Sequence, residues 1–386
     1  MANDLIASMV LAIWLYLLAA RGAFWLARER DDDGTSWSGP WPAVSAIIPA
    51  RDEAEYVGQT VDALLRQDYR GEFNVIVVDD QSRDGTTQVA REAAAALGTP
   101  DRLTVLAGRA LAAGWTGKLW AQHQGIEFAE KAPSPATYLL FTDADIVYAP
   151  DALSCLVARA QQGRLVLTSL MVKLRCKSLA ERMCIPAFIL FFQMLYPFAW
   201  ANNPRRATAA AAGGCMLVRR EALRAAGGMT AIRNALIDDC ALAKNLKTRG
   251  PIWVGLTERV HSCRAYPAFG DVRRMVSRTA YAQLHYSPLL LSGTLLGLAV
   301  TYLGPVLLAI FAGGTARILG IVAWLLMALA FQPTLRFYRV SPLWGLALPA
   351  IATTYMAFTV DSAYQHARGR GGMWKGRAQA NLSELR

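Results

Sequence analysis

Short apolar runs alternate with amphipathic segments between about residue 44 and residue 145. We predict that these runs are strands; they comprise residues 44–49, 74–80, 103–106 and 138–141. After the first run, Val57, Val61 and Leu64 recur at the spacing of one helix face. Continuous apolar strands separated by helices are typical of a mostly parallel sheet covered on both faces. The pattern therefore predicts an α/β domain.

The alternation continues less regularly after residue 145. Residues 164–174 and 215–218 are predicted strands, and residues 240–247 a helix. Gly213 and Gly214 precede the second of these strands, where small residues either leave room for a ligand or mark a bulge. Residues 185–200 are rich in aromatic and aliphatic side chains but contain Pro186 and Pro197. We expect this segment at a membrane interface, with a buried core segment as the alternative.

Longer apolar segments lie at both ends of the chain. They are residues 5–26, 288–311, 318–335 and 343–360. Each approaches the roughly 20 residues that cross a bilayer as a helix, and 54% of the chain is hydrophobic. The first segment is predicted to be a transmembrane anchor rather than a cleaved signal peptide. A signal peptide would have basic residues before its apolar part, whereas this segment is preceded by Asp4 and by no basic residue.

The net charge of +11 is concentrated beside these apolar segments. This placement favours anionic lipid headgroups over nucleic acid as the partner. Asp4 before the first segment, with Arg28 and Arg30 after it, predicts that the middle of the chain faces the cytoplasm. Three later spans would then put the basic tail (368–377) outside, against the same rule. One of the C-terminal segments is therefore predicted to be re-entrant or interfacial.

Five regions follow from these patterns. They are an N-terminal transmembrane helix (1–27), a linker (28–43), an α/β domain (44–286) that includes the possible interface segment (184–201), C-terminal membrane helices (287–363) and a basic tail (364–386). The six cysteines form no Cys-x-x-Cys pair, so we expect reduced thiols rather than disulfides or metal ligands.

Acidic residues follow the fourth strand directly. Asp143 and Asp145 are two residues apart, so in a regular strand they would point to the same side. Two adjacent carboxylates repel each other unless a cation or proton lies between them. A divalent metal (Mg²⁺ or Mn²⁺) beside a diphosphate would remove that repulsion. The alternative is a strand end followed by an Asx turn.

Other polar residues share this position at the ends of strands. Asp79 and Asp80 end the second strand, and Lys118 opens the helix after the third. Ligands on parallel sheets bind at the carboxyl ends of the strands. No Gly-x-Gly-x-x-Gly follows the first strand and no Walker A loop is present. The phosphates would then be held by a metal and side chains such as Lys118, which suits a sugar nucleotide.

Asp238 and Asp239 open a predicted helix. Acids at this position commonly cap a helix and interact with its dipole. The functional alternative is a general base that takes the proton of an attacking hydroxyl group.

Five motifs together resemble the family 2 glycosyltransferases of the GT-A fold, a Rossmann-like α/β fold. They are IPARDE (48–53), VVDDQSRDGT (77–86), GWTGK (114–118), TDAD (142–145) and IDD (237–239). A closer resemblance is to the bacterial hopene-associated glycosyltransferases, with the ceramide glucosyltransferase-like enzymes more distant. It rests on SLMVKLRC (169–176), IPAF (185–188), LYPF (195–198), AAAAGGC (209–215) and RTAY (278–281). The resemblance implies a hopanoid context.

The resemblance also implies donor-site roles. Asp143 and Asp145 match the metal and sugar-diphosphate motif. Asp79 and Asp80 match the acids that bind the nucleoside. The matches to the donor-site loops are Glu53 and Lys118.

On the acceptor side, the resemblance implies that Asp239 is the catalytic base, with Asp238 where the family usually has Glu. Related membrane enzymes carry Gln-x-x-Arg-Trp, whereas this chain reads MVSRT at 275–279. Only Arg278 matches that motif, and it is either a diphosphate ligand or an interfacial residue. His261 is a candidate third metal ligand, against a structural role. The WKGR segment (374–377) resembles a C-terminal motif of related enzymes and is expected at the active-site face.

The sequence thus predicts an inverting, metal-dependent glycosyltransferase in the cytoplasmic membrane. The expected donor is a nucleotide sugar, with UDP as the favoured nucleotide, and the expected acceptor is a membrane lipid. A processive polysaccharide synthase is the alternative among enzymes, although the missing tryptophan disfavours it. A transporter or receptor with a nucleotide-binding regulatory domain is the alternative from another class; the spans carry charges only near their ends, at Arg317 and Asp361.

Overall fold

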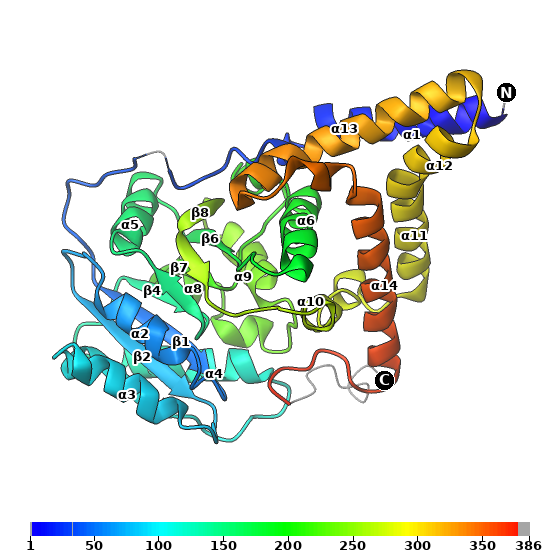
Figure 1. The fold of residues 1–386 in the computed structure, drawn as a ribbon. Coiled ribbons are helices and arrows are strands. Elements are labelled where there is room, and N and C mark those ends of the chain that lie inside the picture. Colours follow the sequence, from blue (N-terminus) through cyan, green and yellow to red (C-terminus); the bar gives the residue numbers. More distant parts are fainter. Residues whose placement is uncertain (1, 33, 377–386) are drawn as a thin grey trace.

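The fold consists of an α/β domain joined to a set of apolar helices (Figure 1). It is seen in a computed structural model that describes residues 2–32 and 34–376. The strands are β1 (Val44–Ala50), β2 (Phe73–Asp79), β3 (Leu103–Ala107), β4 (Tyr138–Thr142), β5 (Ile146–Tyr148), β6 (Leu167–Lys173), β7 (Cys215–Arg219) and β8 (Ile252–Ser262). The helices of the domain are α2 (Val57–Leu65), α3 (Thr86–Ala96), α4 (Gly117–Glu130), α5 (Ala152–Gln162), α6 (Leu179–Leu195), α7 (Phe198–Ala201), α8 (Arg220–Ala225), α9 (Asp238–Lys247) and α10 (Phe269–Ser277). The remaining helices are α1 (Ala2–Ala19), α11 (Pro288–Leu298), α12 (Gly304–Phe311), α13 (Gly314–Tyr338) and α14 (Leu348–Ala367).

The described strands form one sheet in the order β3-β2-β1-β4-β7-β6-β8-β5. The pairs β3–β2, β2–β1 and β1–β4 are parallel, as the sequence predicts. The other half of the sheet is mixed, because β7 runs antiparallel to both β4 and β6, and β5 antiparallel to β8. The predicted α/β class and mostly parallel sheet are therefore confirmed. The reversal at β7 depends on pairings that the sequence pattern does not specify.

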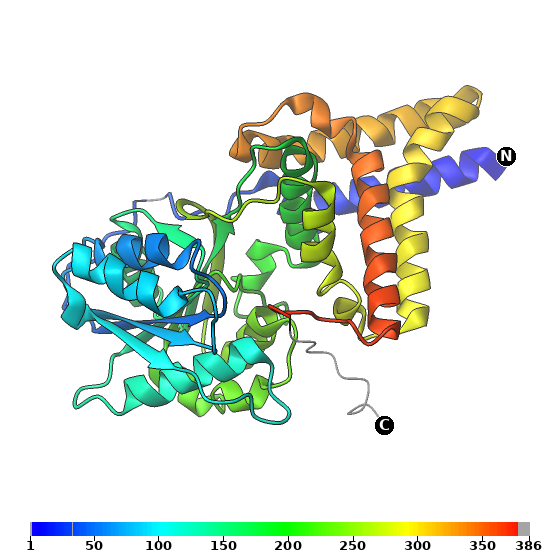
Figure 2. The ribbon, with the colours of Figure 1, turned by 60° about the horizontal axis from the view of Figure 1, so that its bottom comes forward.

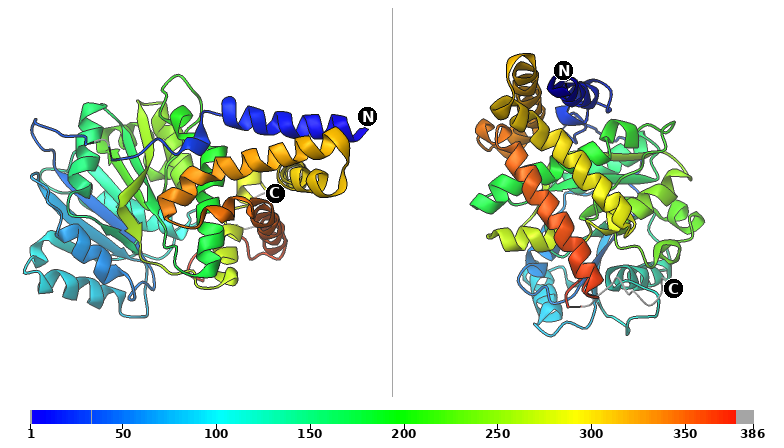
Figure 3. Two further views of the ribbon diagram at one scale, coloured as in Figure 1. Left: turned by 45° about the horizontal axis from the view of Figure 1, so that its top comes forward. Right: turned by 90° about the vertical axis from the view of Figure 1, so that its right-hand side faces the viewer.

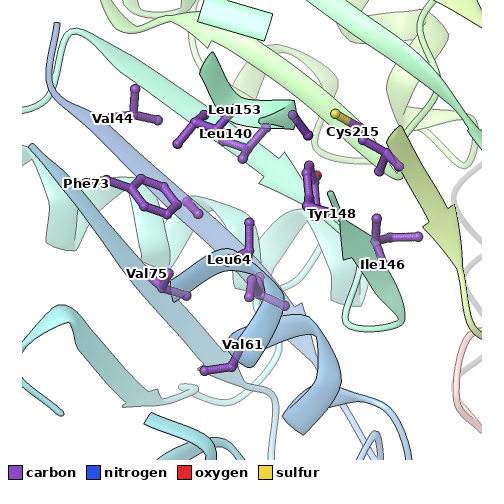
Figure 4. Packing of buried hydrophobic residues seen from close by; sticks show 14 of the residues in the cluster. Val44, Val61, Leu64, Phe73, Val75, Leu140, Ile146, Tyr148, Leu153 and Cys215 are labelled. Atoms are coloured by element: carbon purple, nitrogen blue, oxygen red, sulfur yellow. The ribbon is translucent and has the colours of Figure 1, made fainter. Parts of the chain in front are cut away.

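Helices cover both faces of the sheet. On one face α2, α3 and α5 pack over β1, β2 and β4, and Figure 4 shows Val61 and Leu64 of α2 directed toward Val75 and Leu140 of the sheet. On the other face α4 and α9 enclose a second buried cluster that includes Phe141. Burial on both faces explains why the central strands are almost continuously apolar.

The N-terminal membrane span is not confirmed. The helix α1 ends at Ala19, whereas the prediction extended to residue 26, and Gly22 has a left-handed backbone (φ 65°) that fits the end of a helix. Its continuous apolar part, Asn3–Ala19, is shorter than the described helices that are long enough to cross a bilayer.

Three described helices are long and apolar enough to span a membrane: Leu179–Ala201, Pro288–Phe311 and Gly314–Tyr338. The last two agree with the predicted C-terminal segments and support membrane association. The first contains the predicted interface segment, which forms α6 and α7; it is half buried in the protein. The third predicted C-terminal segment (343–360) falls on α14, which begins later, at Leu348, and is not among the candidate spans.

Three of the apolar helices project from the domain together. Figures 1 and 2 show α1 and α13 side by side with α12 at their outer end, and Figure 3 shows the same arrangement from two further sides. Helices α11 and α14 also lie side by side and run across the direction of α1 and α13. Many large apolar side chains on these helices are exposed, among them Leu5, Ile6, Leu289, Leu296, Leu307, Phe311, Ile318 and Leu325.

Candidate active site

Polar residues from several strand ends line a cavity of about 420 Å³ at the carboxyl edge of β1 and β4. Its acidic lining residues are Glu53, Asp143, Asp145, Asp238 and Asp271. Its basic lining residues are Lys118, Arg264, Arg274, Arg278 and Lys375. The acids and bases come from segments up to about three hundred residues apart in the chain. The parallel register of β1 and β4 brings the first of these segments to one edge.

Lys118 connects the acids on one side of this polar cavity. Its ammonium group lies 2.9 Å from Asp143 Oδ1 and 3.3 Å from Asp238 Oδ2. Burial alone would lower the pKa of Lys118, but Asp143 and Asp238 outweigh that effect and raise it above its usual value. Lys118 therefore stays charged and holds together two acids that would otherwise repel each other.

Asp239 lies beside this group and is half-buried. Its Oδ2 accepts a hydrogen bond from the Gly213 amide at 2.9 Å, and its Oδ1 accepts one from the Cys240 amide at 2.7 Å. Burial, followed by the adjacent Asp238, raises the pKa of Asp239 to about 6. The carboxylate is thus a stronger base than an ordinary aspartate and is still mostly ionised at pH 7.

Gly213 permits this approach. A Cβ at this position would lie 3.1 Å from Lys118 Nζ and 3.4 Å from Asp239 Oδ2. The absent side chain at Gly213 therefore leaves room for two polar side chains, Lys118 and Asp239. At Gly214 an added Cβ would instead meet a core side chain, 2.8 Å from Val172 Cγ2.

Asp145 pairs with an arginine. Arg264 Nε lies 2.7 Å from Asp145 Oδ2, and Arg264 Nη2 lies 2.8 and 2.7 Å from the two oxygens of Glu53. Ser262 donates a further hydrogen bond to Asp145 at 3.1 Å. Burial alone would lower the pKa of Arg264, whereas Asp145 and Glu53 raise it above its usual value. The guanidinium group therefore fills the space between two carboxylates.

The described residues do not present an open metal site. Asp143 pairs with Lys118 and Asp145 with Arg264, and no group of three or more His, Cys, Asp or Glu side chains in residues 2–32 and 34–376 is arranged to hold a metal ion. His261 is exposed and does not line the polar cavity. Its neighbour Ser262 faces Asp145, and strand alternation directs His261 to the opposite side of β8. The donor set as arranged does not fit a divalent ion.

Asp79 and Asp80 lie at the end of β2 but do not line the polar cavity. Asp79 accepts hydrogen bonds from the Ser82 amide and the Thr87 hydroxyl, so it organises the turn before α3. Asp80 is 1% exposed and lies 3.6 Å from Arg51. The structure places both acids next to the loop that carries Glu53, because Ala50 pairs with Asp79 and Arg51 lies beside Asp80.

A second, apolar chamber of about 380 Å³ adjoins the polar cavity. Aromatic and aliphatic side chains of α6, α10, α11 and α14 line it, including Phe188, Phe191, Phe192, Leu298 and Tyr355. Asp239 lines the chamber, and Asp238 and Arg278 line both spaces. Arg278 is exposed and forms no ion pair within the described chain. The acidic start of α9 thus separates a charged space from an apolar one.

Arg264 of the polar cavity was not singled out by the sequence analysis, and Lys375 was named only as part of a motif. Arg264 follows β8 by two residues, and only the pairing of β8 with β5 brings it to Asp145. Lys375 belongs to the WKGR segment, whose expected place at the active-site face agrees with the cavity lining by Trp374 and Lys375. Arg377 of that segment lies outside the described residues.

Comparison with known proteins defines the domain. The family model "Glycosyl transferase family 2" matches residues 45–227. This match covers just under half of the chain and supports a family 2 glycosyltransferase domain. Glycosyltransferase AglE of Haloferax volcanii is 34% identical over 105 residues, which are 27% of this chain and 31% of that relative. The match thus spans about a third of the relative's length.

One solved structure has the same fold, and a second is a weaker match. A mannosyltransferase from Pyrobaculum calidifontis, solved with GDP-mannose and Mn²⁺, aligns with a TM-score of 0.53 and 20% identity over 95% of this chain and 99% of its own. Mannosyl-3-phosphoglycerate synthase from Rubrobacter xylanophilus aligns with a TM-score of 0.41 and 19% identity over 69% and 82%. The first likeness confirms a GT-A-like fold; the hopene-associated subgroup stays a prediction.

Proposed function

We propose that this protein is an inverting glycosyltransferase that moves a sugar from a nucleoside-diphosphate sugar to a membrane lipid. The observation that carries the proposal is the position of Asp238 and Asp239 between the polar cavity and the apolar chamber. A sugar diphosphate suits the charged side and a lipid suits the apolar side. The family 2 domain and the GDP-mannose held by the Pyrobaculum relative support the donor class.

The transfer is a single displacement at the anomeric carbon. A lipid hydroxyl group reaching Asp239 from the chamber attacks that carbon, and its proton passes to the Asp239 carboxylate as the new C–O bond forms. The bond to the nucleoside diphosphate breaks on the opposite face. Lys118 and Arg264 offer the positive charge that stabilises the leaving diphosphate. The products are a glycosylated lipid and a free nucleoside diphosphate.

A chelation experiment tests separately whether the divalent metal predicted from the sequence takes part in the transfer. Asp143 and Asp145 are the residues that would hold it, yet both carboxylates pair with basic side chains here. If a metal takes part, excess chelator stops the transfer and Mn²⁺ or Mg²⁺ restores it. Full transfer in excess chelator would remove the metal from the proposal.

We place the domain at the cytoplasmic face of the inner membrane. Residues 373–375 line the same cavity as Glu53, so the chain after α14 lies on the side of the domain. The candidate spans Pro288–Phe311 and Gly314–Tyr338 would cross the bilayer and return, while α14 stays on the domain's side. This arrangement removes the conflict over the basic tail, because the number of C-terminal crossings is then even.

The lipid acceptor belongs to a hopanoid or related lipid pathway in this proposal. The direct test incubates the purified full-length protein with radiolabelled UDP- and GDP-sugars and a membrane lipid extract. Label is expected in the lipid phase, on a product that mass spectrometry shows to be heavier by one sugar. The absence of labelled lipid with every donor would overturn the proposal, and a product with many sugars would favour a processive synthase instead.

A further inference from the structure

The chain leaves α14 and turns back to the polar cavity. Gly369 and Gly372 have left-handed backbones, with φ of 70° and 64°, and redirect the chain between the helix end and residue 373. Met373, Trp374 and Lys375 then line the cavity. We call residues 373–375 the strap. Figure 2 shows this C-terminal stretch crossing from α14 to the α/β domain.

The strap is fixed to the loop after β1 through Lys375. Lys375 Nζ lies 2.8 Å from Glu53 Oε1 and donates a hydrogen bond to the Asp52 carbonyl at 2.9 Å. Arg51 Nε donates to the Lys375 carbonyl at 3.3 Å. Arg51 also lies 3.6 Å from Asp80, the predicted nucleoside-binding acid. The strap is thereby joined to the predicted donor loop at two points.

Lys375 is the second cation beside Glu53 in this network. Glu53 already receives two hydrogen bonds from Arg264, so one carboxylate faces two positive groups. If Lys375 moved its ammonium group to another anion, Glu53 would keep its two hydrogen bonds from Arg264, which it shares with Asp145. The Lys375 side chain is 25% exposed, which leaves it accessible from the cavity. A group with these properties is suited to receive an incoming anion.

We propose that Lys375 is a donor-binding residue, which the strap delivers to the diphosphate of the nucleotide sugar. This inference rests on the proposed function, since it assigns a ligand to the same cavity. On donor binding the ammonium group passes from Glu53 to a diphosphate oxygen, and the strap closes one wall of the polar cavity. No bond other than hydrogen bonds and ion pairs changes in this step.

The test measures binding rather than transfer. Purified full-length wild type and Lys375→Gln are titrated by calorimetry with GDP and UDP, and with guanosine and uridine as probes that lack phosphate. Loss of one charge-assisted hydrogen bond is expected to weaken diphosphate binding by roughly 10- to 100-fold. Binding of the nucleoside itself should not change, whereas general damage to the site would weaken both.

Two further variants complete the experiment. Arg370→Gln changes a cation in the same C-terminal stretch that does not line the cavity, and it is expected to bind the diphosphates like wild type. Lys375→Arg keeps the charge and should recover part of the affinity. Diphosphate binding by Lys375→Gln equal to that of wild type would overturn the role of the strap while leaving the proposed function intact. A wild-type protein that binds neither GDP nor UDP would overturn both.

Discussion

The polar cavity and the apolar chamber are neighbours of similar size but opposite chemistry. One is lined by acids and bases in equal number among the described residues, and the other mainly by aromatic and aliphatic side chains. They share Asp238 and Arg278, and Asp239 faces the apolar side. The acidic start of α9 therefore forms the boundary between the polar cavity and the apolar chamber. A carboxylate at this boundary can accept a proton from the hydroxyl group of an apolar molecule, while a charged molecule occupies the neighbouring polar cavity.

The largest effect is expected when the proposed general base is removed. Asp239→Asn is expected to lower the transfer rate by roughly 10²- to 10⁴-fold, because the amide cannot take the hydroxyl proton. Binding of GDP or UDP should stay near that of wild type, since Asp239 does not line the polar cavity. Radiolabel transfer and calorimetry measure the two effects separately. Transfer at the wild-type rate would show that Asp239 is not the base.

The second prediction concerns the chamber alone. Ala280 lines the apolar chamber, and Ala280→Phe would fill part of it. The acceptor KM is expected to rise by roughly tenfold, because the added ring occupies space that the proposed lipid acceptor would fill. The donor KM should not change. Ala225→Phe at the exposed end of α8 serves as the control. A rise in donor KM alone would mean that the two spaces are not used separately.

The third prediction is a pH profile. Burial and Asp238 raise the pKa of Asp239 to about 6. The active form of the base is the carboxylate, so the transfer rate should be constant above this pKa and fall about tenfold per pH unit below it. Asp238→Asn removes one cause of the raised pKa and should move the acidic limb to lower pH. An acidic limb that moves upward, or does not move, would contradict the assignment.

The smallest expected effect is at Gly213, which lies beside the Lys118 ammonium group and the Asp239 carboxylate. Gly213→Ala places a methyl group 3.1 Å from Lys118 Nζ and 3.4 Å from Asp239 Oδ2. The end of the lysine side chain can shift, so a decrease of only a few-fold in kcat is expected. Gly293→Ala in α11 is the matched control, because nothing lies within 4 Å of its added Cβ. Equal kcat values for the two variants would mean that this contact does not constrain the site.

Local features of the sequence predicted much of the domain. The strands around Ile47, Val77 and Leu140 and the helix that starts beside Lys118 appear close to their predicted positions. Continuous apolar runs identify buried strands because both sheet faces are covered. The pattern did not predict that β7 runs antiparallel to β4, since a buried strand has the same apolar pattern in a parallel and in an antiparallel pair. It also placed the end of the first helix too late.

The sequence by itself determined which residues end the strands, because apolar periodicity and motif order are local properties. The sequence alone predicts that Asp143, Asp145, Lys118 and Asp238 belong to the site. Only the tertiary structure decided their partners: Arg264 reaches Asp145 through the pairing of β5 with β8, and Lys375 reaches Glu53 from the end of α14. These contacts join residues more than a hundred positions apart. Strand pairing and chain reversal set such contacts, and a local pattern does not encode them.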